Sequence, residues 1–374
     1  MSLGRAVRMM LVLFMLCSGF SHFTFATNYL RFFTPQPKAN WDGLLKICKE
    51  KNQSIVTLYD EEDGKFVSKH FINESTIWLG LHRTRVNGVN ASFWSNGIPF
   101  TFNISSVNVS NGEQICEAIE NNRWKGFNCS GQKSFMCYKG NKYILIETEK
   151  KNWCQAQLYC RKYFDDLVSI SNETQNQQVI EKGKKKTFWI GLMHDEWEWV
   201  DKGCSTYRDW DKNHIVNGRA KNHVKQTNWS PLLTQEHYTQ LFPTLCSSGT
   251  VRIKVIKENL TWEEAYNYCQ ANHTRLLQIE HKKDQEAVEQ WLNSTDVESN
   301  LFWIGLRQSR VFGFWIWSNT AVTDNKWKNE KPPEMPFSNH CGVISKNDNY
   351  TWSDENCLYQ HYFLCEEDIS FTRE

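Results

Sequence analysis

The sequence has almost no net charge, no long apolar run beyond its first residues, and no motif typical of a hydrolase or a nucleotide-binding enzyme. Its 43 basic and 42 acidic residues give a formal net charge of +1, so nothing steers the whole protein toward nucleic acid or an anionic membrane. No later stretch reaches the ~20 apolar residues that a membrane span needs. Gly-x-Ser-x-Gly, His-Glu-x-x-His and phosphate-loop patterns are missing. We therefore expect no enzyme, no nucleic-acid partner and no membrane span.

The first residues have the pattern of a secretory signal peptide. Arg5 and Arg8 precede an apolar run over residues 9–16, and small residues follow up to Ala26. Because this run is shorter than a membrane span, it favours a cleaved leader over an anchor. We predict a signal peptide over residues 1–26 and a secreted, extracellular and soluble mature chain.

Cysteine is abundant, with 13 residues in the chain. Cys17 falls in the predicted signal peptide, and the others form three groups of four. The groups are Cys48, Cys116, Cys129 and Cys137; Cys154, Cys160, Cys204 and Cys246; Cys269, Cys341, Cys357 and Cys365. An even number of cysteines in a secretory chain indicates disulfides rather than metal thiolates.

Asn-x-Ser/Thr sequons agree with this compartment and predict a heavily glycosylated surface. They begin at Asn52, Asn73, Asn90, Asn103, Asn108, Asn128, Asn172, Asn228, Asn259, Asn272, Asn293 and Asn349.

One short apolar pattern occurs three times and organises the rest of the chain. Trp-Leu/Ile-Gly-Leu stands at residues 78–81, 189–192 and 303–306. Each copy has strand length, and its glycine suits a strand only where packing leaves no room for a side chain. A helix face of Trp, a small or apolar residue and Cys precedes each copy. The faces are Trp41/Leu44/Cys48, Trp153/Ala156/Cys160 and Trp262/Ala265/Cys269. A period near 110 residues therefore indicates three copies of one domain, each with its own core.

Helix signals support the same division. Asn40 is a good N-cap for the first helix of repeat one, and Thr261 with Glu264 forms a capping box in repeat three. Second helices are predicted over residues 61–70 and 282–292. The second repeat loses the pattern after Trp210.

The segment 211–243 of repeat two has no counterpart of Tyr350-Thr351-Trp352 and lacks the two late cysteines. Genuine divergence and an error in the predicted transcript are both open explanations.

The sequence features of the three repeats resemble those of the C-type lectin-like domain family. The family marks are the helix Cys, the Trp-Ile-Gly-Leu strand, a Trp-x-Trp-Ser strand and a Trp shortly before the last cysteine pair. Tandem copies are similar to a stretch of the mannose-receptor family. The resemblance implies an α+β fold of three tandem domains, each with two helices, small antiparallel sheets and a long loop, stapled by disulfides. The domains would span residues 28–139, 140–248 and 250–368.

The family's disulfide pattern implies a bridge from the first helix to the last strand and a second bridge near the long loop. The implied pairs are Cys48–Cys137, Cys116–Cys129, Cys269–Cys365 and Cys341–Cys357. In repeat two only Cys160–Cys246 carries over, which leaves Cys154 and Cys204 to pair with each other. The long bridge closes nearly a whole domain, which chain-entropy reasoning values at about 4 kcal/mol.

Sugar-binding members of this family hold Ca²⁺ with carboxylate and amide oxygens. In repeat three Lys331-Pro332-Pro333 and Trp352-Ser353-Asp354 stand at the two ligand tripeptides. Lysine brings a positive charge and proline no side-chain oxygen, so we favour a loop that folds without metal and expect no required cofactor. Asn339 and Asp354 are the weak candidates for Ca²⁺, and Glu330 and Glu334 flank the loop. The candidate ligand-binding residues are Glu330, Glu334, Asn339, Trp352 and Asp354.

Repeats one and two offer fewer candidate metal ligands than repeat three. Ile98-Pro99-Phe100 keeps only the proline, and Trp124-Lys125-Gly126 has no carboxylate. His214, His223 and His237 are irregularly spaced, which indicates surface histidines rather than a transition-metal site.

The resemblance implies a secreted recognition protein that binds glycans or glycoproteins, with a place in innate immune recognition. The alternative is a calcium-independent protein-binding molecule with no sugar activity.

Overall fold

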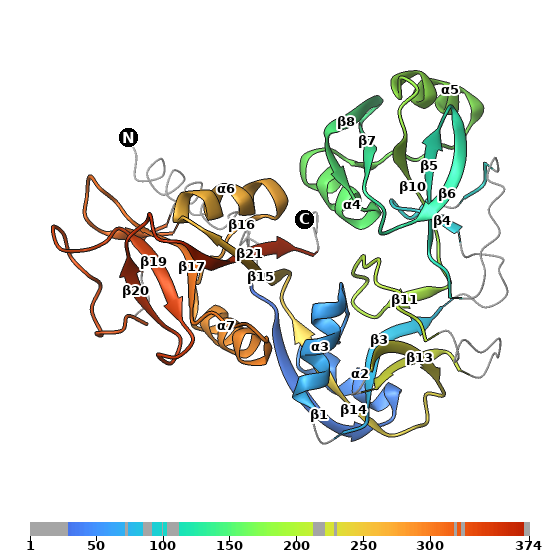
Figure 1. Ribbon diagram of the computed structural model, residues 1–374. Coiled ribbons are helices and arrows are strands. Elements are labelled where there is room, and N and C mark those ends of the chain that lie inside the picture. Colours follow the sequence, from blue (N-terminus) through green and yellow to red (C-terminus); the bar gives the residue numbers. More distant parts are fainter. Residues whose placement is uncertain are drawn as a thin grey trace, which may run out of the picture.

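The computed structural model describes residues 29–71, 74–84, 92–98, 100–102, 112–211, 221–227, 230–317, 320–322 and 326–369. The predicted signal peptide, Cys17, Pro99, His214 and the sequons at Asn73, Asn90, Asn103, Asn108 and Asn228 lie outside the described residues. Three compact lobes of helices and strands are visible in Figure 1. Within this part of the chain, no helix is long and apolar enough to cross a membrane.

The third unit is continuous in sequence over residues 250–369 and gives the pattern for the others. Its elements are β15 (Val251–Leu260), α6 (Trp262–Asn272), β16 (Arg275–Leu276), α7 (Lys282–Ser294), β17 (Leu301–Gln308), β18 (Trp315–Ile316), β19 (Cys341–Ser345), β20 (Thr351–Glu355) and β21 (His361–Asp368). The sheet runs β15-β21-β17-β19-β20, with β16 beside β21 and β18 beside β17. Thr261 and Glu264 form the predicted capping box of α6.

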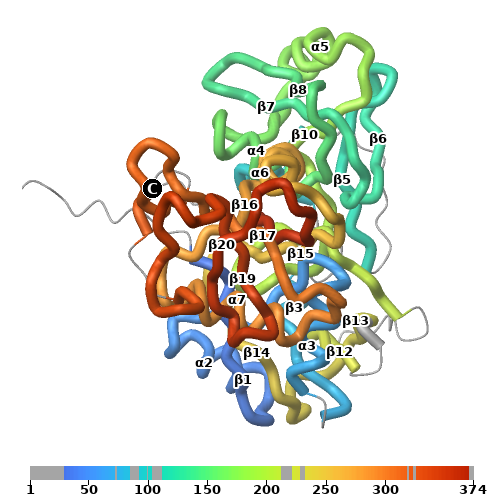
Figure 2. The backbone as a smooth tube through the Cα atoms, turned by 60° about the vertical axis from the view of Figure 1, so that its left-hand side comes forward, coloured from blue at the N-terminus to red at the C-terminus, as the bar shows by residue number. Residues whose placement is uncertain are grey.

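The composite unit takes its elements from two separate stretches of the chain, residues 29–84 and residues 197–248. The first stretch gives β1 (Phe32–Ala39), α2 (Trp41–Glu50), β2 (Ser54–Ile55), α3 (Glu61–His70) and β3 (Thr76–Arg83). The second gives β11 (Trp197–Trp199), β12 (His223–Thr227), β13 (Ser230–Glu236) and β14 (Phe242–Ser248). Two sheets result, β1-β14-β2 and β11-β3-β12-β13. In Figures 1 and 2, blue and yellow elements accordingly share one lobe.

The permuted unit fills the stretch between these two, residues 92–194. Its elements are β4 (Ser92–Trp94), β5 (Ile115–Glu120), β6 (Arg123–Asn128), β7 (Lys133–Lys139), β8 (Lys142–Lys151), α4 (Trp153–Tyr163), β9 (Asp166–Leu167), α5 (Glu173–Lys182) and β10 (Phe188–His194). The sheet runs β6-β5-β10-β7-β8, with β4 beside β10 and β9 beside β7. The strands that end a repeat therefore come first in this unit, and those that begin a repeat come last.

Repeats one and two have exchanged their C-terminal halves. In the third unit β17 pairs with β18, β19 and β21 of the same repeat. Strand β3 of repeat one instead pairs with β11 and β12 of repeat two. Strand β10 of repeat two pairs with β4, β5 and β7 of repeat one. The expectation that each repeat has its own core is therefore wrong for the first two repeats.

The connections between paired strands give a physical reason for the exchange. In the third unit residues 309–314 turn the chain back from β17 to β18, whereas only Asp195 and Glu196 separate β10 from β11. A shortened hinge favours a chain that runs on into a neighbouring unit over one that folds back. The extended path is held by Arg83, whose Nε donates to Glu196 Oε2 at 2.9 Å.

The exchange changes two of the expected disulfides. Cys48 pairs with Cys246 rather than Cys137, and Cys160 pairs with Cys137 rather than Cys246, each pair with Cα atoms 5.4 Å apart. The cause is that β14, not β7, lies beside the first helix of the composite unit. The four other implied or remaining pairs are present, namely Cys116–Cys129, Cys154–Cys204, Cys269–Cys365 and Cys341–Cys357.

The segment after Trp210 is part of the fold. Residues 221–227 and 230–248 supply β12, β13 and β14, which complete the composite unit. Trp210 bridges to Leu233, as Trp327 bridges to Trp352 in the third unit. Leu233 of repeat two thus occupies the position that Trp352 holds in repeat three. This difference explains why the resemblance between the repeats fades there.

The glycines of the repeated strand motif lie where packing leaves no room for a side chain, as the sequence predicted. A Cβ on Gly80 would come within 2.7 Å of Ile55 O, and one on Gly305 within 2.8 Å of Leu276 O. A Cβ on Gly191 would lie 2.9 Å from Ser95 Oγ and 3.0 Å from the carbonyl oxygen of Leu167. Crossing backbones and neighbouring side chains exclude a side chain at this position in all three units.

The composite and third units share one hydrophobic cluster. Phe33 and Phe66 of the composite unit pack on Trp291 of α7, with ring centroids 6.4 and 4.6 Å away. Beside them Arg252 of β15 is 5% exposed and contacts Asp60 Oδ2 at 2.6 Å and Asp63 Oδ1 at 3.3 Å. Buried charge of this kind is tolerated only when it is paired. The contact between the composite and third units is therefore specific, because Arg252 must meet its acidic partners.

Candidate functional site

The long loop of the third unit lies between β18 and β19 and is fixed to the core through Pro333. The Pro333 carbonyl accepts hydrogen bonds from Trp315 Nε1 at 2.9 Å and from Gln308 Nε2 at 3.2 Å. Both donors come from the strands β17 and β18, so the loop has a defined position on this end of the unit. Lys331 is exposed beside it.

Asn339 and Asp354 are brought together, as the sequence suggested, but through the backbone. The amide N of Asn339 donates to Asp354 Oδ2 at 2.6 Å. This places Asp354 in a turn-stabilising role and uses part of its capacity for accepting hydrogen bonds. Its register partner across β19 and β20 is Gly342, which offers no side-chain oxygen.

The remaining candidates do not join this pair. Glu330 and Glu334 are exposed loop residues, and the described residues contain no group of three or more His, Cys, Asp or Glu able to hold a metal. Trp352 is 1% exposed, and its Nε1 donates to Gln285 Oε1 at 2.9 Å. Trp352 is therefore a core residue and cannot contact a ligand, contrary to the sequence-based assignment.

The arrangement does not fit a calcium site. Ca²⁺ takes six to eight oxygen ligands, and affinity rises with the number of carboxylates. Asp354 is a single carboxylate that already accepts an amide hydrogen bond.

An exposed apolar patch surrounds the same loop and was missed from the sequence. The patch comprises Val311, Phe312, Phe314, Met335 and Phe337, and Phe312 and Phe337 are 74% and 94% exposed. The rings of Phe312 and Phe314 stack with centroids 5.6 Å apart. A pocket of about 560 Å³ opens beside them, lined also by Trp315 and Trp327. The signal in the sequence was Val-Phe-Gly-Phe at a hairpin tip, where polar residues are usual.

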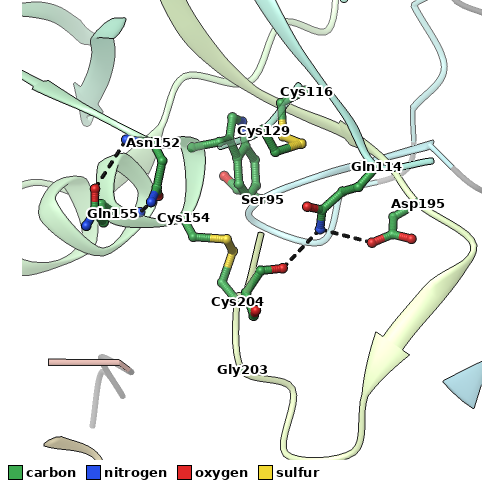
Figure 3. The surroundings of a disulfide bond; sticks show 12 residues. Ser95, Gln114, Cys116, Cys129, Asn152, Cys154, Gln155, Asp195, Gly203 and Cys204 are labelled. Atoms are coloured by element: carbon green, nitrogen blue, oxygen red, sulfur yellow. Dashed lines mark hydrogen bonds between the residues drawn. A yellow bond between two sulfur atoms is a disulfide. The ribbon is translucent and has the colours of Figure 1, made fainter. Parts of the chain in front are cut away.

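In the permuted unit the equivalent end faces the composite unit. Gln114, two residues before Cys116 as Asn339 is before Cys341, donates from Nε2 to Asp195 Oδ2 at 3.0 Å and to Ser205 O at 3.2 Å. Figure 3 shows these contacts beside the disulfide that joins Cys154 of α4 to Cys204. The loop end of this unit is therefore engaged in an internal contact.

The composite unit has no carboxylate where the third unit carries Asp354. Its register places Gln235 opposite Val224, at the position that Asp354 holds opposite Gly342. His223 of β12 lies half-buried against Trp41, with ring centroids 4.3 Å apart. The expectation that His223 is a scattered surface histidine is wrong, because the exchanged strand carries it into the unit.

The strand pairing, the paired helices and the disulfides define a tandem lectin-type fold. The family model "Lectin C-type domain" matches residues 37–139, 149–248 and 258–367. The chain therefore belongs to the C-type lectin domain family, and its tandem domains resemble those of the mannose-receptor family.

Two curated relatives have similar repeats. The human secretory phospholipase A2 receptor is 22% identical over 63% of this chain and 18% of its own length. The mouse C-type mannose receptor 2 is 21% identical over 89% of this chain and 28% of its own length. The chain thus spans less than a third of either relative. Among solved structures, human lithostathine is 19% identical and covers 32% of this chain and 85% of its own, with a TM-score of 0.30.

Proposed function

We propose that this protein is a secreted, extracellular recognition protein that binds the polypeptide of a glycoprotein partner through the loop face of its third unit, without calcium and without catalysis. The fold is of a lectin and receptor type, which makes glycans and proteins the two relevant ligand classes. Six disulfides among the described residues support an oxidising compartment. A role in innate immune recognition stays a prediction.

The observation that carries the proposal is the apolar patch. Exposed apolar patches on a folded protein mark interaction sites. Five large apolar side chains here are at least 40% exposed, and three of them, Phe312, Phe314 and Met335, line one pocket. Aromatic residues around a pocket are typical binding hot spots, because they bury much area at a small cost in side-chain entropy. The pocket beside Phe312 and Met335 suits one apolar or aromatic side chain of the partner.

The ligand set on the same face supports independence from calcium. Asp354 alone cannot balance the desolvation of a dication, and the exposed Lys331 adds repulsion. A partner that binds here must therefore use apolar contact and direct hydrogen bonds.

The test is a binding screen of the full chain against a panel of purified extracellular glycoproteins, in calcium and again in chelator. We expect a partner that is bound equally in both, and a loss of at least tenfold in affinity for Phe312→Ser with Phe337→Ser. Leu241→Ser is the matched control, because Leu241 is an exposed apolar residue of the composite unit. Binding that needs calcium, or that survives the double substitution, would contradict the proposal.

A further inference from the structure

The disulfide Cys154–Cys204 differs from the other five among the described residues because it joins two units. Cys154 lies in α4 of the permuted unit, and Cys204 follows β11 of the composite unit, with Cα atoms 5.4 Å apart. Figure 3 shows the bond reaching from the helix to a loop. Each of the other bonds has both of its cysteines in one unit. Apart from the backbone, Cys154–Cys204 is therefore the covalent tie between the composite and permuted units in the described part of the chain.

The fold of a unit does not require a cysteine at this position. Cys154 is the second residue of α4 and follows the tryptophan that begins the first helix of every unit. The equivalent residues are Asp42 in α2 and Glu263 in α6, and both are exposed. The two joined units also have internal disulfides, namely Cys48–Cys246, Cys116–Cys129 and Cys137–Cys160. Loss of the bond between the units would leave these internal bonds in place.

The bond is accessible to a small reagent. Both cysteines line a pocket of about 410 Å³ in which all three units meet. Cys154 is 8% exposed and Cys204 is half-buried, whereas four of the other disulfides have both cysteines at 0% exposure. Charged residues of both signs line the pocket. The fifth bond, Cys341–Cys357, is comparably exposed but lies within the third unit.

The position of Cys154 favours breakage in one direction. It lies in the first turn of α4, and the N-terminus of a helix carries a partial positive charge that stabilises a nearby thiolate. In thiol–disulfide exchange, the sulfur whose thiolate is better stabilised leaves more readily. Cys204 is also the more exposed residue of the pair. An incoming thiolate therefore attacks Cys204 Sγ and releases Cys154.

The other contacts of the permuted unit with its neighbours are noncovalent. Trp210 Nε1 of the composite unit donates to Gly112 O at 2.6 Å, and Gln114 Nε2 donates to Ser205 O at 3.2 Å. A cleft of about 690 Å³ beside Trp210 and the pocket at the disulfide leave open space between the same two units. The disulfide is therefore an important part of their attachment.

The third unit contacts the permuted unit through the surface ion pair Lys162–Asp368 at 3.2 Å. A surface ion pair of this kind adds little stability, so it does not replace the disulfide.

We propose that Cys154–Cys204 is a redox-sensitive lock between the composite and permuted units, which a dithiol reductant opens while every unit stays folded. The units are then free to separate, because noncovalent contacts alone hold them. The lock goes beyond the proposed function, since it concerns the first two units and not the loop face of the third.

The chemistry is two successive thiol–disulfide exchanges. The first thiolate of the reductant bonds to Cys204 Sγ, the bond between the two cysteines breaks, and Cys154 leaves as a thiolate that takes up a proton. The second thiolate attacks the reductant's own sulfur in the mixed disulfide, so that Cys204 leaves and is protonated in turn. The dithiol loses two electrons and two protons and becomes a disulfide, and the two cysteines gain both.

The first measurement identifies which bond opens first. The full disulfide-bonded chain is treated with limiting dithiothreitol, free thiols are trapped with N-ethylmaleimide, and the labelled peptides are identified by mass spectrometry. We expect Cys154 and Cys204 to be labelled at least tenfold faster than any other pair. Cys341 and Cys357 are the internal reference, because their bond is comparably exposed. Earlier labelling of that pair, or of any other, would overturn the proposal.

The second measurement follows the arrangement of the units by small-angle X-ray scattering. The selectively reduced chain, and the variant Cys154→Ser with Cys204→Ser, should both have a larger radius of gyration than the oxidised chain, with an unchanged circular dichroism spectrum. Cys341→Ser with Cys357→Ser is the matched control and should leave the radius unchanged. The reduced chain needs no substitution, so it decides the question even if a variant is not secreted. An unchanged radius on selective reduction would contradict the lock, as would the loss of the folded spectrum.

Discussion

His223 and Tyr238 of the composite unit occupy the two positions at which the third unit carries the disulfide Cys341–Cys357. His223 lies opposite His82 as Cys341 lies opposite Arg307. The carbonyl of Tyr238 accepts from Trp41 N at 3.1 Å, as that of Cys357 accepts from Trp262 N at 3.1 Å. The two rings are 6.0 Å apart. Aromatic contact thus replaces a covalent bond in this unit.

The first prediction restores that bond. His223→Cys with Tyr238→Cys should form a disulfide, because the equivalent Cα atoms of the third unit are 5.2 Å apart and a bridge requires about 4.4–6.8 Å. For a loop of this length, chain-entropy reasoning gives about 3 kcal/mol of added stability. Peptide mapping without reductant detects the bond and chemical denaturation measures the gain. Either single substitution serves as the control and should be destabilising.

The second prediction concerns acid. Burial, and then the neighbouring His82, lowers the pKa of His223 from its usual 6.5 to about 4. Between these values the unfolded chain binds a proton that the folded chain does not. Stability should therefore be complete above about pH 6.5 and fall as the pH drops toward 4. His223→Phe should flatten this dependence in denaturation curves recorded across the window, and an unaltered slope would show that other groups cause it.

The third prediction tests the exchange. Residues 28–139 expressed alone should not fold as a monomer, because β3 would lack β11 and β12, β1 would lack β14, and β5 and β7 would lack β10. Residues 28–248 should fold. Size-exclusion chromatography and peptide mapping distinguish the cases, and a monomeric first repeat with a Cys48–Cys137 bond would contradict the structure.

The fourth prediction concerns the joint between the composite and third units. Arg252→Met leaves Asp60, Asp63 and Glu367 without their shared partner. Breaking a buried ion pair from one side costs about 3–5 kcal/mol. Denaturant unfolding should show this loss, whereas Lys65→Ala, which removes an exposed pair with Glu61, should have little effect. Equal effects of the two variants would show that the Arg252 ion pairs do not stabilise the fold.

Local structure could be predicted from the sequence because its signals are local. The second helix of repeat one is Glu61–His70, as expected, and Asn40 caps the first helix through a 2.8 Å bond to Gly43 N. Equivalent strands of repeats one and two offer the same apolar pattern, so the sequence specifies the kind of partner a strand needs but not which copy supplies it. The short Asp195-Glu196 connection favours the exchange, and its effect is visible only when the paths of both repeats are traced.

The candidate site could be predicted only in part. Asn339 and Asp354 do meet, because family spacing fixes the ends of β19 and β20. Trp352 was misassigned, since a tryptophan beside a ligand tripeptide gives no indication of the direction in which its ring points. The cleft beside Trp210 could not be foreseen, because its walls come from residues 59–61, 112–130 and 206–210, which only the exchanged halves bring together.

The two-residue connection between β10 and β11 also constrains how this chain can change over generations. A gene of independent repeats gains or loses them one at a time. Here the deletion of either of the first two repeats would leave half of each unit without its complement, so those two repeats must be inherited, duplicated or lost as a pair. The third can vary in number without that restriction, provided that the surface around Arg252 is covered.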